Sequence, residues 1–198
     1  MRILILGPQG SGKGTQAKRI AAAYDVPHVA TGDILRRAIA EGSELGLRVE
    51  PILERGDLVP DDLMVDLIRE RLADEHGFVL DGFPRTVPQA EALDTMLQEI
   101  GKPLDIVLLL EVSDDVALER LLERRAEEGR LDDAPEVIRN RLRLYHGLTE
   151  PVVERYQGML HTVDGELTMG DVFAAIEEAL MQLGPDSLGS DPEKVTSA

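Results

Sequence analysis

The sequence predicts an α/β protein with three layers, in which a five-stranded parallel sheet is flanked by helices. Apolar runs of strand length alternate with longer amphipathic stretches along the 198-residue chain. Such alternation is typical of βαβ units, whose parallel strands are buried on both faces. Because 43% of the residues are apolar, the chain can form one sizeable core, and we expect a single domain over residues 1–183.

Five strands are expected. The runs at 2–6, 77–81 and 105–112 are apolar almost throughout, as in strands that are covered on both faces. Two shorter runs, at 27–30 and 159–163, bring the expected sheet to five strands, which is a usual size.

Helices are expected between and after these strands. Stretches with helical periodicity are found at 14–24, 87–100, 114–125, 135–148 and 169–183. The region 31–60 contains two or three short helical patterns and no strand pattern, so we interpret it as a small substrate subdomain outside the sheet. Residues 184–198 lack apolar periodicity and are expected to form a disordered tail.

The charge of the chain restricts its partners. The formal net charge is -17, and a surface of that sign repels the phosphate backbones of nucleic acids and anionic membranes. A small phosphate ligand is compatible with this charge, because salt screens exposed charges beyond about 8 Å and a local arginine cluster can oppose the global field. We therefore expect no nucleic-acid partner and no membrane partner.

Two features that the sequence lacks restrict the class of protein further. No apolar run approaches the roughly 18 residues of a membrane span, and the apolar opening is too short for a signal peptide, so a cytoplasmic location is expected. The chain contains no cysteine. Disulfides, a thiolate zinc site and a cysteine nucleophile are therefore excluded, and no zinc is expected.

A glycine-rich loop, GPQGSGKGT, follows the first strand directly. Its glycines and lysine match GxxxxGK, with a strand before and a helix after. Backbone N–H groups can converge on an anion there, the helix N-terminus adds positive potential, and Lys13 would reach the β and γ phosphates. The residues expected to contact a nucleoside triphosphate are Gly10, Ser11, Gly12, Lys13, Gly14 and Thr15. The hydroxyl of Thr15 comes one position late, which weakens its assignment to magnesium; a turn that binds nothing is the disfavoured alternative.

Two further motifs indicate a second phosphate site. TGD precedes a helix, where Thr31 and Asp33 could equally be helix caps. DGFPR stands at the carboxyl end of a strand, where open parallel sheets bind ligands, and carries Arg85 on a stiff turn; a plain turn with a surface arginine is the alternative. Gln89 follows Arg85 by four residues, so both side chains can face one cleft if helical geometry already holds there.

An arginine falls on the apolar face of the helix expected at 135–148. That face, taken at about 100° per residue, consists of Val137, Ile138, Leu142, Leu144, Tyr145 and Leu148. Arg141 lies near its middle, and a buried guanidinium without an anion is costly. We therefore expect beside Arg141 either a ligand phosphate or an internal carboxylate, for which the candidates are Asp33, Asp132 and Asp133.

Together these segments resemble the adenylate kinases, within the wider nucleoside monophosphate kinases. The resemblance covers residues 1–183 and rests on GKGTQ, TGD, DGFPRT, GRLDD and Arg141. It implies a P-loop kinase fold and reversible, magnesium-dependent transfer of a phosphoryl group from ATP to AMP, giving two ADP. ATP and AMP or ADP are then the expected partners, and Mg²⁺ is the expected cofactor.

The same resemblance implies roles for individual residues. The residues that would contact AMP are Thr31, Arg36, Leu53, Val59, Gly82, Arg85, Gln89, Arg130 and Arg141. Arg120 would lie over the ATP adenine and Arg124 would meet the transferring phosphate, although a solvated helix face is the ordinary explanation for such a pair. The residues that would act in catalysis are Lys13, Arg85, Arg124, Arg130 and Arg141.

Transfer between two nucleotides requires no general base. The acceptor phosphate has a second pKa of about 6, so it is mostly deprotonated at neutral pH, and we interpret the four histidines as structural. Asp81 is the expected magnesium-linked carboxylate, directly or through water, with a helix or turn cap as the alternative.

Four residues, AEEG, separate Arg125 from Arg130, so the resemblance implies a short lid loop at 125–135, with Gly129 as hinge. It also implies a monophosphate-binding subdomain at 31–60.

DGFPRTVPQ resembles adenylate kinases more than UMP/CMP kinases, which remain an alternative. An ATP-binding switch or ATPase is a further alternative, but it leaves Arg36 and Arg85 without function. A monomer is favoured, although a neighbouring copy could cover the surface that a short lid exposes.

Overall fold

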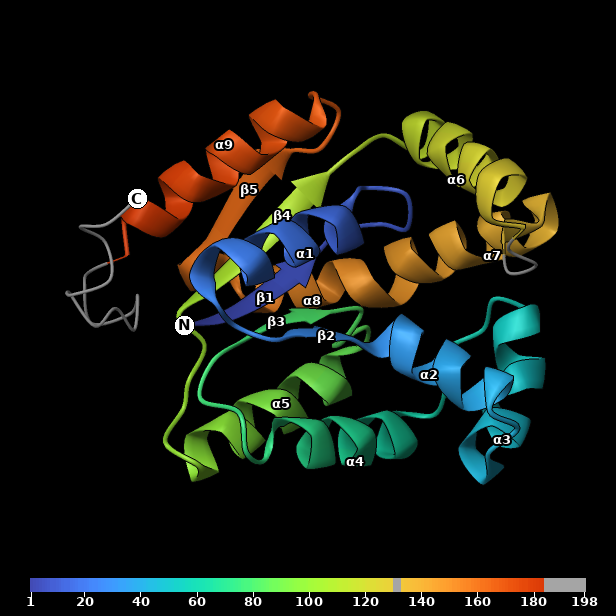
Figure 1. Cartoon of the computed structure of the whole chain (residues 1–198), viewed down its shortest axis with the longest axis horizontal. Helices are drawn as coiled ribbons and strands as arrows, with labels where there is room; N and C mark the ends of the chain where they lie inside the picture. Colours follow the sequence, from blue (N-terminus) through green and yellow to red (C-terminus); the bar gives the residue numbers. More distant parts are fainter. Residues whose placement is uncertain (130–132, 184–198) are drawn as a thin grey trace.

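Figure 1 shows the computed structural model of the chain, which describes residues 1–129 and 133–183. Within these residues the sheet consists of five parallel strands in the order β2-β3-β1-β4-β5. The strands are β1 (Arg2–Leu6), β2 (His28–Ala30), β3 (Phe78–Asp81), β4 (Ile106–Glu111) and β5 (Leu160–Asp164). Each lies where the sequence predicts a strand, so the predicted α/β fold is confirmed.

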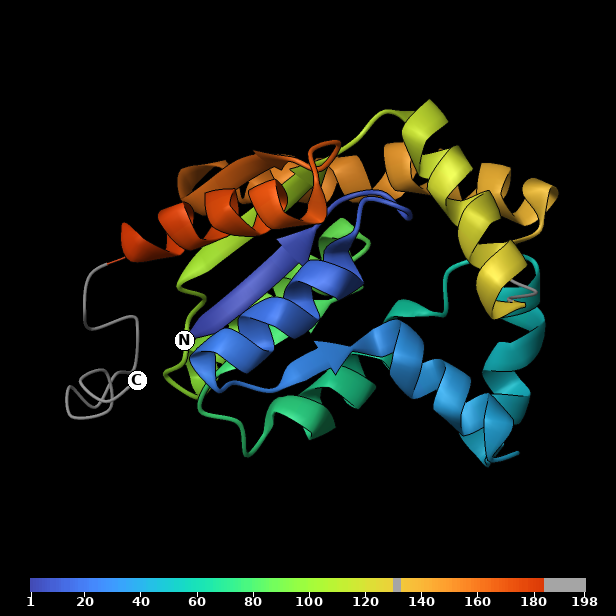
Figure 2. The same ribbon diagram turned by 45° about the horizontal axis from the view of Figure 1, so that its top comes forward.

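Helices cover both faces of the sheet and make three layers (Figure 2). Ile3 and Ile5 of β1 pack in one core with α1 (Lys13–Tyr24) and α9 (Met169–Met181). Leu4 and Leu6 pack in a larger core on the opposite face, against helices that come from three parts of the chain. These are α4 (Asp61–Leu72), α5 (Val87–Glu99) and α8 (Glu150–Arg155). Burial on both faces explains why the strand is apolar at every position after Arg2.

The region 31–60, all of which the structure describes, contains two helices and no strand, within the range predicted. α2 (Thr31–Ala40) and α3 (Glu44–Glu54) project from the sheet on the side of its carboxyl ends (Figure 1). Ser43 caps α3 by accepting a hydrogen bond from the N–H of Gly46 at 3.1 Å. The side chain of Ser43 therefore gives a hydrogen-bond partner to a backbone N–H group in the first turn of α3.

Other helical segments differ from the prediction. The sequence pattern was assigned no element at α4 or α8, and α6 (Asp114–Glu128) runs three residues past its predicted end. The helix predicted at 135–148 ends early, because α7 (Pro135–Leu144) passes into a π-helical turn, Tyr145–Thr149. The wider turn rotates the face, so Leu148 is 41% exposed instead of buried, whereas Thr149 is buried.

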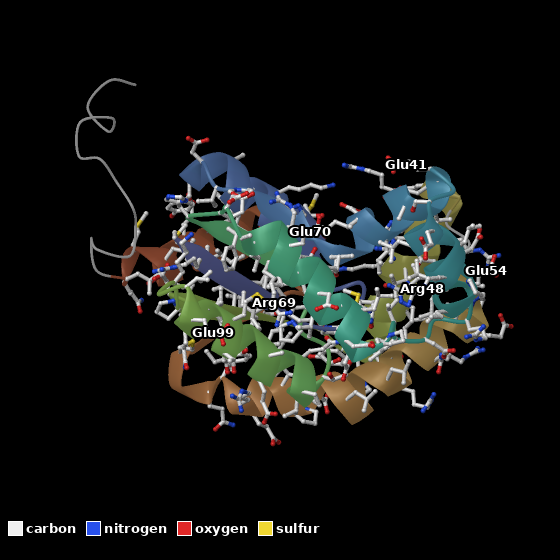
Figure 3. The ribbon with its side chains drawn as sticks, turned by 90° about the horizontal axis from the view of Figure 1, so that it is seen from below. Glu41, Arg48, Glu54, Arg69, Glu70 and Glu99 are labelled. Atoms are coloured by element: carbon white, nitrogen blue, oxygen red, sulfur yellow. The ribbon has the colours of Figure 1, made fainter. Side chains whose placement is uncertain are left out.

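The outer faces of several helices carry charged side chains. Figure 3 labels six of them on or beside α2, α3, α4 and α5, and all six are exposed: Glu41, Arg48, Glu54, Arg69, Glu70 and Glu99.

In the part of the chain that the structure describes, no helix combines the length and apolarity needed to cross a bilayer. Arg130, Asp132 and the tail expected at 184–198 lie outside the described residues.

Candidate functional site

The glycine loop, residues 7–15, connects β1 to α1 at the carboxyl edge of the sheet. β1 lies between β3 and β4, at the kind of position where open parallel sheets bind ligands. Gly12 precedes α1 with a φ of 90°, a backbone conformation that favours glycine. At Gly10, an added Cβ would lie 2.6 Å from the carbonyl oxygen of Ala117 on α6. The loop therefore needs glycine both for its conformation and for its close approach to α6.

The loop forms part of the wall of a cavity of about 850 Å³. The predicted ATP contacts, six from the loop motif and two from the resemblance, all line this cavity: Gly10, Ser11, Gly12, Lys13, Gly14, Thr15, Arg120 and Arg124. Asp81, at the end of β3, lines it too, and its Oδ2 would lie 3.5 Å from a Cβ placed on Gly14. The cavity has the size of a small-molecule site, in the range of roughly 300–1,000 Å³.

Lys13 lies in a strongly positive part of this cavity. Its Nζ donates to three groups of the loop, the carbonyl oxygens of Gly7 (2.7 Å) and Pro8 (2.6 Å) and the Oγ of Ser11 (3.3 Å). Burial lowers the pKa of Lys13 from its usual 10.5 to about 8, Asp81 opposes this shift, and Arg85, Arg141 and Arg124 add to it. An anion bound here would be strongly stabilised.

A smaller cavity of about 60 Å³ adjoins the first. It is lined by every described residue that the resemblance assigns to AMP: Thr31, Arg36, Leu53, Val59, Gly82, Arg85, Gln89 and Arg141. Arg36, Arg85 and Arg141 line both cavities. The two spaces thus meet at guanidinium groups, which suit two phosphate groups that approach end to end.

Arg85 and Gln89 are held on the turn that follows β3. The Nε of Arg85 donates to the carbonyl oxygen of Gly82 at 2.8 Å, and its backbone N–H donates to the Oε1 of Gln89 at 2.7 Å. Arg85 precedes α5, which begins after the N-cap residue Thr86. The sequence argument required Arg85 and Gln89 to lie on one helix, and this requirement is not met because Arg85 precedes α5. The two residues are joined instead by the hydrogen bond from the backbone N–H of Arg85.

Thr31 and Asp33 do not cap α2, so the capping alternative is wrong. The N-cap is Ala30, and it has no side-chain hydrogen bond. Thr31 is buried, and its Oγ1 donates to the carbonyl oxygen of Asp81 at 3.3 Å. Asp33 pairs instead with Arg36, with 2.5 Å between Oδ1 and Nη2. Thr31 therefore attaches the start of α2 to the end of β3.

A buried carboxylate joins two of the arginines. Asp133 accepts hydrogen bonds from the Nε and Nη2 of Arg124, at 2.7 and 2.8 Å, and from the Nη1 of Arg141 at 3.0 Å. Its side chain is fully buried. Arg141 thus has one of the three internal carboxylates considered from the sequence, and it lines both cavities as well. The two possibilities are compatible in this fold.

Several residues at the site were not predicted. His28, expected to be structural only, lines the larger cavity with its Nε2 3.5 Å from the Oδ2 of Asp81. Asp61 accepts hydrogen bonds from Gln89 and Thr86. The segment after β5 contributes Gly165, Leu167, Met169 and Val172 to the wall. Its place at the carboxyl end of a predicted strand was the one available signal.

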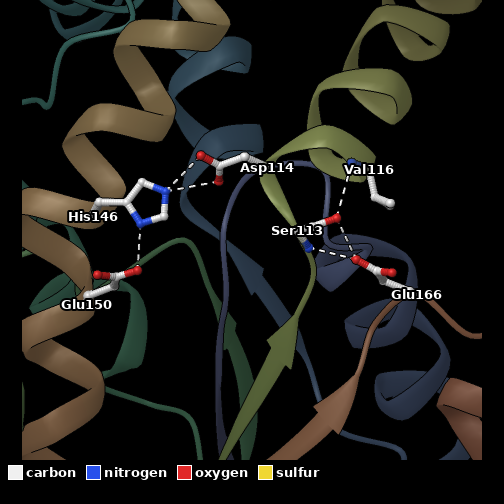
Figure 4. Close-up of polar contacts among 6 residues, drawn as sticks. All are labelled: Ser113, Asp114, Val116, His146, Glu150 and Glu166. Carbon is white, nitrogen blue, oxygen red and sulfur yellow. Dashed lines mark hydrogen bonds and ion pairs between the residues drawn. The ribbon is translucent and has the colours of Figure 1, made fainter.

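The start of α6 is attached on two sides (Figure 4). The N–H and Oγ of Ser113 donate to the Oε1 of Glu166, at 2.8 and 2.7 Å. His146 lies between two carboxylates, with its Nδ1 2.6 Å from Glu150 and its Nε2 2.9 Å from Asp114. Hydrogen bonds with Glu150 and then Asp114 raise the pKa of His146. These contacts hold the N-terminal end of α6, a helix that lines the larger cavity.

The Nη1 of Arg120 donates to the carbonyl oxygen of Gly165 at 2.8 Å, so this arginine is held between α6 and the segment after β5. Both Arg120 and Arg124 line the larger cavity, and the solvated face considered for this pair is therefore not what the structure shows.

Comparison with known proteins gives one consistent result. The family model described as "Adenylate kinase" matches residues 5–160. Curated proteins named adenylate kinase from Xanthomonas euvesicatoria pv. vesicatoria and Xanthomonas axonopodis pv. citri are each 46% identical over 185 residues, covering 91% of this chain and 99% of the relative. A protein of the same name from Lachnospira eligens is 43% identical over 212 residues, covering 91% of this chain and 100% of the relative.

Proposed function

This chain belongs to the adenylate kinase family, and we propose that it transfers the γ-phosphoryl group of MgATP directly and reversibly to AMP, giving two ADP. It is a phosphotransferase. The observation that carries the proposal is that Arg36, Arg85 and Arg141 line both cavities. An ATP-binding switch or ATPase would leave the smaller cavity without function, and the comparisons do not favour these alternatives or a UMP/CMP kinase.

In the proposed complex, the glycine loop holds the donor phosphates. Backbone N–H groups of the loop, the start of α1 and the amine of Lys13 would bind the β and γ phosphates. The planar guanidinium of Arg120 would stack on the donor adenine. Arg36 and Arg85 would bind the acceptor phosphate, with Thr31, Leu53, Val59, Gly82 and Gln89 around the acceptor nucleoside.

Catalysis in this proposal depends on positioning and charge neutralisation. The acceptor oxygen is already deprotonated at neutral pH, so no residue has to remove a proton. Arg124 and Arg141, held by Asp133, would stabilise charge on the transferring phosphoryl group. We assign the same task to Arg130, which would come from the lid.

Asp81 suits the Mg²⁺ ion that enters with ATP. Its carboxylate lies beside the loop at the sheet edge, and its side chain is 15% exposed. Within residues 1–129 and 133–183, no three His, Asp or Glu side chains form a cluster for a metal. Mg²⁺ is often bound by one or two carboxylates together with substrate phosphates and waters. When bound, the ion would neutralise charge on the donor phosphates.

We assign residues 31–60 to acceptor binding and residues 125–135 to a short lid. Gly129 is the C-cap residue that follows α6, and its φ of 66° suits a hinge glycine at the helix end. The alignment with the Lachnospira protein spans 212 residues, more than the 198 of this chain, so that relative contains residues without a counterpart here.

A coupled assay with MgATP and each of AMP, UMP, CMP and GMP tests the proposal. AMP is expected to be the fastest acceptor. Arg85→Ala should lower kcat/KM for AMP by about 100-fold or more, because it removes a guanidinium from both cavities.

Arg139→Ala is the matched control, since Arg139 is exposed on α7, and it should change kcat/KM by less than about twofold. ATP hydrolysis that does not depend on AMP would contradict phosphoryl transfer between nucleotides. Comparable or faster turnover with UMP or CMP would overturn the assignment of AMP.

A further inference from the structure

The geometry around Gln89 points to a specificity-determining role for Asp61. We propose that Asp61 is a positioning residue that fixes the amide of Gln89 in one orientation, so that the acceptor site selects amino bases over oxo bases. This inference rests on the proposed function and names a determinant of its acceptor specificity.

Both ends of the Gln89 amide are held by internal partners. The residue is 2% exposed, its Oε1 accepts from the N–H of Arg85 at 2.7 Å, and its Nε2 donates to the Oδ1 of Asp61 at 2.7 Å. A backbone N–H can only donate, and an ionised carboxylate can only accept. If the amide turned over, donor would face donor and acceptor would face acceptor. The two partners therefore permit one orientation.

Asp61 is itself fixed in place. It stands in the first turn of α4, and its Oδ2 accepts from the Oγ1 of Thr86 at 3.0 Å. Thr86 caps α5 by accepting from the N–H of Gln89 at 3.3 Å. The starts of α4 and α5 are thus joined by a closed set of hydrogen bonds among Asp61, Thr86 and Gln89. This set keeps the carboxylate opposite Nε2.

A fixed amide has a consequence for base recognition. Gln89 lines the smaller cavity together with Leu53, Val59 and Met64. Beyond the contacts above, a primary amide has one further N–H on nitrogen and one further lone pair on oxygen. In adenine, N1 accepts and the 6-amino group donates, which complements this order. In guanine, N1–H donates and O6 accepts. The amide N–H would then face N1–H, and the amide oxygen would face O6. A site with such unpaired polar groups rejects the analogue strongly.

Cytosine shares the donor and acceptor order of adenine, and uracil shares that of guanine. The orientation of Gln89 therefore separates amino bases from oxo bases and does not by itself separate purines from pyrimidines. The informative quantity is the ratio of kcat/KM for AMP to kcat/KM for GMP, because both are purines.

The test compares Asp61→Ala with Asp62→Ala. Asp62 also lies in the first turn of α4, but it is exposed and its Oδ1 accepts from the N–H of the adjacent Leu63, so its removal changes the helix start without affecting Gln89. For Asp61→Ala we expect the KM for AMP to rise about tenfold, with kcat within about twofold and an unchanged KM for ATP. The AMP-to-GMP ratio should fall by about tenfold, because Nε2 loses its acceptor and only the N–H of Arg85 then opposes the reversed orientation of the amide. Asp62→Ala should leave the ratio unchanged.

Two further variants separate positioning from stability. Asp61→Asn keeps the shape and one acceptor oxygen, so it should restore most of the AMP-to-GMP ratio. If Asp61→Ala does not fold, Asp61→Ser loses the carboxylate while remaining favourable at a helix start, and the same loss of ratio is expected.

An Asp61 variant that lowers the Tm but keeps the wild-type ratio would show a structural role only and overturn this inference. A wild-type protein that does not phosphorylate AMP would overturn the proposed function, and this inference with it.

Discussion

Single residues at the site show how a folded chain keeps partly buried cations in position before a ligand arrives. Lys13 donates to two carbonyl oxygens and a hydroxyl of its own loop, and Arg124 and Arg141 share the carboxylate of Asp133. A cation without such partners would be costly to bury. The internal acceptors therefore keep these groups at the cavity wall, where phosphate oxygens can take over part of their role.

Because the pKa of Lys13 is lowered, we predict that the protein takes up protons when ATP binds. Its pKa is about 8 in the free protein, so the amine is about half protonated at pH 8. Phosphates beside the amine favour its charged form and raise its pKa, so binding should take up about half a proton per ATP at that pH. Isothermal titration with ATP alone, in buffers of different ionisation enthalpy, measures this uptake.

Lys13→Arg provides the control, because a guanidinium stays protonated at pH 8. This variant should bind ATP without the uptake. Proton release by the wild type, or equal uptake in both proteins, would mean that the amine of Lys13 is not the group that titrates.

Among the elements, the five strands and most of the helices were predicted from local sequence patterns, whereas α4 and α8 were not. β1 and β4 are apolar almost throughout because both of their faces are covered, and that pattern is visible in the sequence. α4 was not predicted, although its buried residues Met64, Ile68 and Leu72 recur every four residues. The face of α7 was predicted only up to its end, since a constant 100° per residue fails at the π-helical turn.

The same division holds within the candidate site. The glycine loop and the turn around Arg85 are local motifs, and their residues line the cavities as the resemblance implies. The contact of Gln89 with Asp61 joins residues 28 positions apart on two helices. Such a contact depends on how α4 and α5 pack, and no spacing in the sequence encodes it. The pairing of Arg141 with Asp133 likewise could be established only from the fold.

The packing of α2 against α3 gives a prediction for acceptor binding. At Gly46 on α3, an added Cβ would lie 2.1 Å from the carbonyl oxygen of Ala38 on α2. Gly46→Ala should force the helices apart and lower the free energy of unfolding by about 1–3 kcal/mol. Because α2 carries Arg36, the KM for AMP should rise while the KM for ATP stays unchanged. Thermal unfolding and steady-state kinetics measure these effects.

Gly170→Ala is the matched control. Gly170 stands in the first turn of α9, where the nearest atom to an added Cβ is 3.8 Å away. Its replacement should be neutral or slightly stabilising. If Gly46→Ala left the KM for AMP unchanged, the packing of α2 on α3 would not position the acceptor site.

At the scale of the whole molecule, three parts of the chain meet around the cavities: the carboxyl edge of the sheet, the α2–α3 pair and the α6–α7 pair (Figure 1). The Nδ2 of Asn140 on α7 donates to the carbonyl oxygen of Arg55 and to Asp57, at 2.9 and 3.0 Å, so α7 also touches the end of the α2–α3 region. Nucleotides in the two cavities would add further links among these parts.

Binding of both nucleotides should therefore stabilise the whole fold. A ligand that binds only the folded state adds about 2.7 kcal/mol at 100 times its Kd, and each kcal/mol raises the Tm of a chain of this size by about 2–4 °C. ATP without magnesium should raise the Tm by about 5–10 °C, and AMP should add a further increase. Arg85→Ala should lose most of the increase due to AMP, whereas Arg139→Ala should keep it. If AMP added nothing to the effect of ATP, the smaller cavity would not bind the acceptor. If Arg85→Ala behaved like the wild type, the guanidinium between the cavities would not be what holds the acceptor phosphate.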